Sequence, residues 1–128
     1  MKIKLKKETQ GLSNYDLNVL LPILIKGLKT KKGKANAVNG KQIIERLRNH
    51  GLMINTRSMG MLIRYIRTND LIEGLMASSA GYYISNNEYE LANYEASLLG
   101  REESIRDMRI SMQRQRRKMF APRQRELF

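Results

Sequence analysis

The stretch NGKQIIERLRNHGLMINTRSMGMLIRYIRT, residues 39–68, contains two successive helix patterns joined by a short connection. Asn39 and Gln42 have the spacing of a capping box, in which each side chain bonds the backbone amide of the other residue. Apolar residues then recur at helical spacing until Gly51, a residue type that commonly ends a helix in a left-handed conformation. The connection 52–54 follows. The stretch therefore predicts a helix, a turn and a second helix.

The second helix of this stretch has two chemically different faces. Asn55 or Thr56 can cap it. Its apolar face consists of Met59, Leu62, Ile63 and Ile66. Its opposite face is polar, basic and partly aromatic, and consists of Arg57, Ser58, Met61, Arg64, Tyr65 and Thr68. Because the apolar face is the one that packs on a core, the basic face is predicted to be free for an anionic partner.

Another helix is predicted before residue 39. Ser13 can cap it, and Pro22, which lacks an amide hydrogen, should start it or kink it. Its broad apolar face consists of Leu17, Leu20, Leu21, Leu24, Ile25 and Leu28. Residues 29–37 contain four Lys and one Gly and are predicted to form a loop. Residues 1–14 are interpreted as a basic N-terminal arm, either mobile or paired as an edge strand.

The spacing of apolar residues changes between residues 71 and 85, where the pattern is typical of a β-hairpin. The small residues 77–80 are predicted to form its tip. Because side chains alternate along a strand, we expect Tyr82 and Ile84 to point toward the core and Tyr83 to point outward.

A long helix is predicted over residues 87–120, because Asn87 and Glu90 have capping-box spacing and no proline occurs before Pro122. Apolar side chains recur every seven residues along it, as in a coiled coil, although two polar residues interrupt the series. The predicted seam consists of Leu91, Leu98, Ile105, Met108 and Met112. This stripe either packs onto the preceding domain or forms a homodimer with a second copy. Residues 121–128 are interpreted as a short tail.

The chain is strongly and unevenly basic. Of its 128 residues, 24 are Lys or Arg and 12 are Asp or Glu, which gives a formal net charge of +12. Such a charge attracts polyanions, nucleic acid among them. Residues 71–99 contain no Lys or Arg, so the positive charge is concentrated on other surfaces. One of these is a basic tail region with Arg114, Arg116, Arg117 and Lys118. That region either adds non-specific affinity for DNA or docks a replication or transcription partner.

Composition excludes several kinds of chemistry. The chain has no cysteine and one histidine, His50, so thiolate and histidine-rich metal sites cannot form. No nucleophile, base and orienting group occur in a recognisable pattern, and we expect neither an enzyme nor a cofactor. The longest apolar run, residues 19–25, is far shorter than the roughly 20 residues of a membrane span. We therefore expect a cytoplasmic protein that does not cross a membrane.

The predicted order of helix, basic loop, helix, turn, basic helix and hairpin resembles the winged helix-turn-helix family of DNA-binding domains. The resemblance covers residues 15–86 and is carried by residues 40–47, by the basic helix 56–68 and by the hairpin. With a long helix after it, the chain is also similar to small winged-helix proteins of phages and other mobile elements. The expected fold class is mainly α with a small β-hairpin (α+β). The wing of the family often carries Lys or Arg, whereas residues 77–80 carry neither.

The resemblance implies that the helix over residues 56–68 enters the major groove of double-stranded DNA. The residues expected to read bases are Arg57, Ser58, Met61, Arg64 and Tyr65. The residues expected to contact phosphates are Lys31, Lys32, Lys34, Lys41 and Arg67. Such a protein would act in association with the nucleoid, as a dimeric transcriptional regulator or a replication accessory factor. The alternatives are a protein–protein adaptor whose long helix recruits a partner, and an RNA-binding protein.

Overall fold

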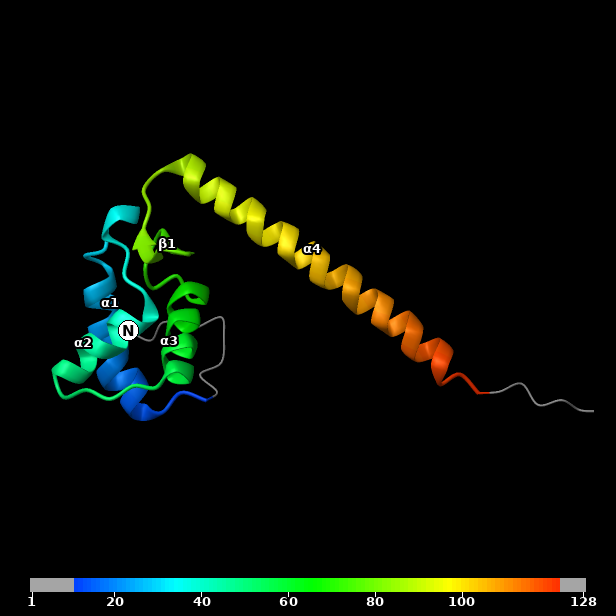
Figure 1. The fold of residues 1–128 in the computed structure, drawn as a ribbon, viewed down its shortest axis with the longest axis horizontal. Helices are drawn as coiled ribbons and strands as arrows, with labels where there is room; N and C mark the ends of the chain where they lie inside the picture. Colours follow the sequence, from blue (N-terminus) through cyan, green and yellow to red (C-terminus); the bar gives the residue numbers. More distant parts are fainter. Residues whose placement is uncertain (1–10, 123–128) are drawn as a thin grey trace, which may run out of the picture. The chain divides into compact units, whose positions relative to one another are not determined.

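The computed structural model describes residues 11–122, which are mainly helical with one two-stranded antiparallel sheet (Figure 1). The helical elements are a π-helical segment (Asp16–Leu20), α1 (Leu21–Leu28), a 3₁₀ turn (Lys34–Asn36), α2 (Gly40–Asn49), α3 (Thr56–Thr68) and α4 (Glu88–Met119). The strands are β1 (Leu75–Ser78) and β2 (Gly81–Ile84). The predicted α+β class, with a small hairpin and a long C-terminal helix, is confirmed. The chain divides into two compact units, Met1–Leu91 and Ala92–Phe128.

The first helix accommodates Pro22 by widening one turn. Leu21 N–H donates to the carbonyl of Asp16, five residues earlier, so the turn that precedes the proline is π-helical. A wider turn relieves the crowding between the pyrrolidine ring and the carbonyl four residues before it. The predicted cap is also present, because Ser13 Oγ accepts a hydrogen bond from Asp16 N at 3.0 Å. The expected disturbance at Pro22 is therefore a π segment within a continuing helix.

The caps of α2 and α3 form as the sequence predicts. Asn39 Oδ1 accepts from Gln42 N at 2.8 Å, and Gln42 Oε1 accepts from Asn39 N at 2.9 Å. Gly51 follows the end of α2 with a φ of 75°, in the left-handed region. Asn55 is the cap of α3, since its side chain accepts from Ser58 N at 2.8 Å. Local hydrogen bonding therefore sets both ends of the turn between the two helices.

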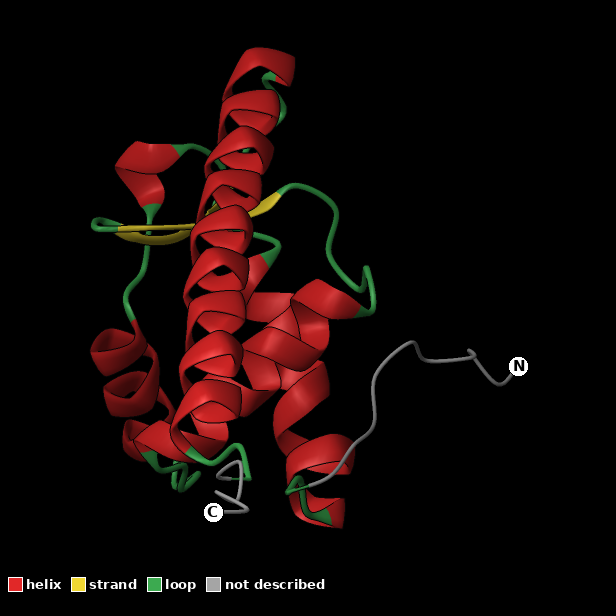
Figure 2. Cartoon of the chain, turned by 90° about the vertical axis from the view of Figure 1, so that its right-hand side faces the viewer, coloured by secondary structure: helices red, strands yellow, loops and turns green. Residues whose placement is uncertain are grey.

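One hydrophobic core holds α1, α2 and α3 together; Figure 2 shows these helices in red and the two strands in yellow. Leu20, Leu62 and Ile66 form its centre, each with 0% of its surface exposed. The other core residues are Leu24, Leu28, Val38, Ile43, Leu47, Ile54, Met59, Ile63, Ile72 and Leu75. All four residues of the predicted apolar face of α3 are among the core residues. The opposite face of α3 therefore points away from the core.

The hairpin is shorter than predicted. β1 begins at Leu75, because Gly74 has a φ of 74° and turns the chain just before the strand. Leu75 pairs with Ile84 and Ser78 pairs with Gly81, so the tip consists only of the residues between the last pair. The segment before Gly74 was predicted as strand, and that part of the prediction is wrong.

The predicted loop after α1 runs beside β2 and pairs with it. Val38 exchanges two backbone hydrogen bonds with Tyr82, with N–O distances of 3.0 and 2.7 Å. Ile84 N donates to Lys31 O at 2.7 Å, and Gly33 N donates to Ile84 O at 2.9 Å. β2 therefore has a partner on each side, and the loop is fixed to the hairpin.

The prediction that Tyr83 faces outward is wrong. Tyr83 is only 3% exposed, and its cross-strand partner Met76 is buried as well. Burial raises the pKa of the Tyr83 hydroxyl. The nearby Glu90 carboxylate raises this pKa further, because it repels the phenolate and accepts a hydrogen bond from the protonated hydroxyl. Tyr82 and Ile84 are half-buried against the core, as predicted. The outer face of the hairpin is therefore also buried at Met76 and Tyr83, and Glu90 in the first turn of α4 interacts with Tyr83 there.

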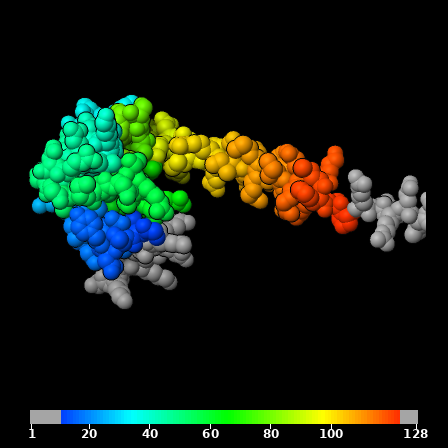
Figure 3. All heavy atoms as spheres, turned by 60° about the horizontal axis from the view of Figure 1, so that its bottom comes forward, coloured from blue at the N-terminus to red at the C-terminus, as the bar shows by residue number. Residues whose placement is uncertain are grey.

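α4 is one continuous helix that begins at the predicted cap, where Asn87 Oδ1 accepts from Glu90 N at 3.1 Å. None of its residues is buried. The large hydrophobic side chains exposed along it are Tyr89, Leu98, Leu99, Ile105, Met108, Met112 and Met119; the helix runs from yellow to orange-red in Figure 3. Among residues 11–122, no helix combines the length and apolarity that a bilayer span requires. Of the predicted arm over residues 1–14 and the predicted tail over residues 121–128, residues 1–10 and 123–128 lie outside the described residues.

Candidate nucleic-acid interface

The free surface of α3 is an arginine face made of Arg57, Gly60 and Arg64. Residues three and seven apart on a helix share a face, and these three lie opposite the side chains that α3 buries. Arg57 and Arg64 are both exposed. Two helical turns separate them, about 10.5 Å along the axis. Two guanidinium groups on a bare helix face can donate to an anionic surface or to the edges of bases.

Gly60 leaves the backbone of α3 uncovered between the two arginines. Apart from the chain neighbours and the backbone of α3 itself, no atom of the described residues lies within 4 Å of the position that a Cβ would take there, so packing does not require glycine. Glycine inside a helix costs about 1 kcal/mol relative to alanine. Because glycine has no side chain, a partner can approach the helix backbone closely at this position.

Gly60→Ala is expected to raise the free energy of unfolding by about 0.5–1 kcal/mol, because alanine loses less backbone entropy and meets no neighbour here. Urea unfolding followed by circular dichroism measures this change. Gly81→Ala is the matched control and should destabilise the chain, since φ is 116° there and a Cβ would meet the backbone of Val38. A Gly60→Ala chain less stable than its parent would show that the space beside Gly60 is occupied.

Three of the five residues predicted to read bases are not fully exposed. Tyr65 is only 7% exposed, so its placement on the free face is wrong. It follows Leu62 by three residues and therefore lies beside it at the edge of the apolar stripe, where neighbouring elements decide whether a ring is covered. Ser58 and Met61 are half-buried. Arg57 and Arg64 are the two exposed members of the predicted set.

The described chain begins beside the arginine face. Gly11 has a φ of 86°, and a Cβ built on it would overlap the side chain of Met61 and lie 3.9 Å from Arg57 Nη2. The backbone at Gly11 therefore runs against Met61, which accounts for the partial burial of that methionine. One flank of the arginine face is thus formed by a segment far from α3 in sequence.

A groove between α2 and α3 adds cationic groups on the side of Gly60. It has a volume of about 710 Å³. Its lining consists of Gly40, Lys41, Ile44, Glu45, Arg48, Thr56, Met59, Gly60 and Tyr82. Lys41 and Arg48 are both exposed. Glu45 lies between them, so the three side chains together carry a net charge of +1. Sequence reasoning missed Arg48, although its seven-residue distance from Lys41 places both on one face of α2.

The lysines predicted to contact phosphates do not share one surface. Lys31 is half-buried and lines a cavity between α1 and α2. Lys32 lines a different cavity of about 480 Å³, together with Asp70 and Glu73. Lys34 is exposed on the 3₁₀ turn. Only Lys41 lines the groove beside Gly60.

The remaining predicted cations are Arg67 and the basic residues near the end of α4. Arg67 is half-buried in the last turn of α3. The last turns of α4, in the second unit, expose Arg114, Arg116, Arg117 and Lys118. The hairpin tip between Ser78 and Gly81 carries no cation. A nucleic-acid contact by the hairpin would therefore use backbone and hydroxyl groups.

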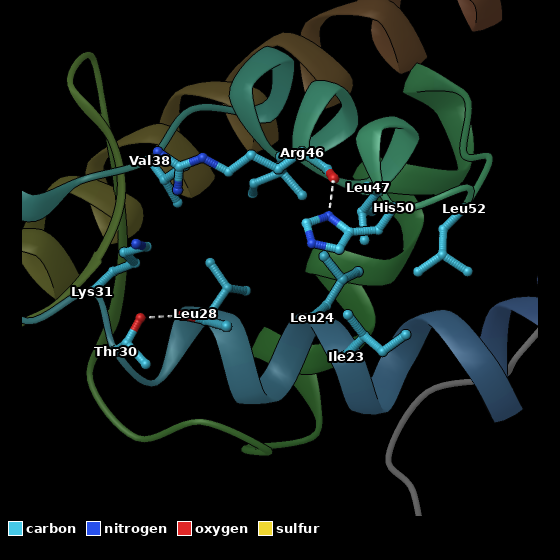
Figure 4. Close-up of a pocket in the computed structure, with 12 residues that line it drawn as sticks. Ile23, Leu24, Leu28, Thr30, Lys31, Val38, Arg46, Leu47, His50 and Leu52 are labelled. Carbon is cyan, nitrogen blue, oxygen red and sulfur yellow. Dashed lines mark hydrogen bonds between the residues drawn. The ribbon is translucent and has the colours of Figure 1, made fainter.

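Figure 4 shows the apolar cavity between α1 and α2, which has a volume of about 400 Å³. Leu24, Leu28 and Leu47 line it, and Arg46 and His50 contribute the polar groups at the α2 side. His50 Nδ1–H donates to Arg46 O at 2.8 Å, which gives the imidazole a structural role at the end of α2. None of the three residues of the arginine face lines this cavity.

Comparisons with protein-family models, with curated proteins and with solved structures found no match to this chain.

Proposed function

We propose that this chain is a winged helix-turn-helix protein that places α3 in the major groove of double-stranded DNA. One observation carries the proposal: Arg57 and Arg64 are exposed on a single face of α3, while the opposite face is anchored in the core. The major groove admits one α-helix, and a guanidinium can donate two hydrogen bonds to a guanine. Gly60 between the arginines lets the helix backbone approach the base edges.

Contacts to phosphates come from the groove beside Gly60. Lys41 lies in the first turn of α2 and Arg48 two turns later, so both can reach one DNA strand that flanks α3. Such contacts set position and affinity, whereas the two arginines of α3 read sequence. Since the tip of the hairpin has no cation, α3 provides most of the sequence selectivity.

The protein acts by occupying a DNA site, as a regulator of transcription or an accessory factor in replication associated with the nucleoid, and it needs no cofactor. A homodimer through α4 would present two copies of α3 to a palindromic site. One observation also favours an adaptor role, because α4 leaves several large apolar side chains exposed. In that case the same helix would recruit a different protein.

Competition between DNA and RNA duplexes tests the proposal. The full chain is bound to a fluorescent DNA duplex, and unlabelled DNA or RNA duplexes of the same length and sequence are added. The DNA competitor is expected to be at least about tenfold more effective, because the major groove of A-form RNA is too deep and narrow for side chains to read.

Equal competition by the two duplexes would contradict a major-groove role for α3 and would favour the RNA-binding alternative. A series of salt concentrations provides the accompanying control. The logarithm of the binding constant should fall with the logarithm of salt at a slope near −0.9 per phosphate neutralised. A chain that binds neither duplex would favour the adaptor role.

A further inference from the structure

The exposed apolar stripe of α4 lies within a helix whose charge is divided between its two halves. Leu98 is 43% exposed, Ile105 61% and Met112 63%, at a spacing of seven residues. Residues 88–107 contain six acids and two bases, whereas residues 109–118 contain five bases and no acid. A helix that covers this stripe must therefore present charges of opposite sign at opposite ends.

A second copy of α4 meets this requirement only when it runs in the opposite direction. Parallel pairing would place the basic halves of both copies side by side, where like charges repel. It would also set Arg101 against Arg101 of the second copy within the apolar stripe. Antiparallel pairing instead sets each acidic half against a basic half and places Arg101 opposite Met112.

One antiparallel register satisfies both the stripe and the charges. In it, Ile105 faces Met108 of the second copy, and Leu98 faces Gln115. At the positions that flank the stripe, Glu95 then faces Arg116 of the second copy, and Glu102, one heptad later, faces Arg109 of the second copy. All four of these residues are exposed.

We propose that two copies of this chain pair antiparallel along α4, with Glu95 and Glu102 of each copy facing Arg116 and Arg109 of the other. The inference deepens the proposed function and rests on its dimer. At 1.5 Å per residue, the two copies of residue 92 are then roughly 45 Å apart along the helix pair. The DNA-reading units consequently leave the pair from opposite ends.

Two charge-reversal variants test this pairing by sedimentation velocity on the full chain. The first carries Glu95→Arg and Glu102→Arg, and the second carries Arg109→Glu and Arg116→Glu. Each alone is expected to self-associate at least tenfold more weakly than the parent, because every flanking pair becomes like-charged. An equimolar mixture should recover dimers, because each variant then meets the opposite charge on the other.

Matched controls change the same charges away from the stripe. Glu103→Arg with Asp107→Arg mimics the first variant, and Arg114→Glu with Arg117→Glu mimics the second. Both controls should self-associate as the parent does, and circular dichroism should report the same helix content throughout. A mixture of the test variants that fails to recover dimers would overturn the antiparallel arrangement, and so would test variants that behave like the controls.

Disulfide trapping gives a second measurement, because the chain has no cysteine of its own. Leu98→Cys alone should remain reduced under mild oxidation, whereas a mixture of Leu98→Cys and Gln115→Cys should cross-link. Rapid cross-linking of Leu98→Cys with itself would show parallel pairing. A parent chain that stays monomeric at high concentration would overturn the dimer. DNA binding through α3 is measured separately, so its failure and that of the pairing are distinguishable.

Discussion

Replacement of both Arg57 and Arg64 by alanine is expected to weaken binding to double-stranded DNA by about 100-fold or more. A guanidinium that donates two hydrogen bonds to a guanine contributes roughly 1–3 kcal/mol of discrimination, and both such groups are lost. The two side chains are exposed on α3, so the fold should be unchanged. Fluorescence anisotropy at one fixed salt concentration measures the affinity.

The matched control removes two positive charges elsewhere in the same unit, by Lys26→Ala with Arg46→Ala. Both residues are exposed, and Arg46 lines the cavity between α1 and α2. This control is expected to weaken binding by less than about tenfold, because it removes only general electrostatic attraction. An equal loss from the two double variants would show that overall charge, and not α3, drives binding.

Leu62→Ala is expected to lower the free energy of unfolding of the first unit by about 2–5 kcal/mol. Leu62 has 0% of its surface exposed at the centre of the core, and truncation there leaves a cavity. DNA binding should be lost as the unit unfolds, because α3 is positioned only by its buried face. Urea unfolding followed by tyrosine fluorescence reports mainly on the first unit, which contains five of the six tyrosines.

Leu99→Ala makes the same chemical change at a position that is 53% exposed on α4. It is expected to change the stability of the first unit by less than about 0.5 kcal/mol. Equal destabilisation by the two substitutions would contradict the assignment of Leu62 to the centre of the core.

Helix ends were predictable from sequence because their causes are local. Asn39, Asn55 and Asn87 each accept a backbone amide hydrogen three residues later, so the signal and the structure occupy the same few residues. The apolar periodicity of α3 likewise identified its buried face. Such features need no knowledge of what packs against the helix.

Features that depend on distant segments were missed. The backbone of Val38 pairs with Tyr82, more than forty residues later, so the loop after α1 gave no strand signal of its own. Tyr83 is buried on the outer face of the hairpin, where Glu90 of the later helix α4 interacts with it. Strand alternation separates two faces, but it does not reveal whether a later helix covers the second one.

The candidate site was predicted in part for the same reason. Arg57 and Arg64 lie at the centre of the polar face, where any packing of the apolar face leaves them exposed. Tyr65 lies at the edge of that face, and its burial depends on neighbouring elements. Arg48 belongs to another helix, and its place beside Gly60 follows from how α2 packs against α3.

Amide chemical shifts of the isotopically labelled full chain, recorded as a short DNA duplex is added, test the central claim most directly. We expect the largest changes on residues 56–64 of α3, with smaller ones at Lys41 and Arg48. Changes confined to residues 109–118 of α4, with α3 unaffected, would contradict it.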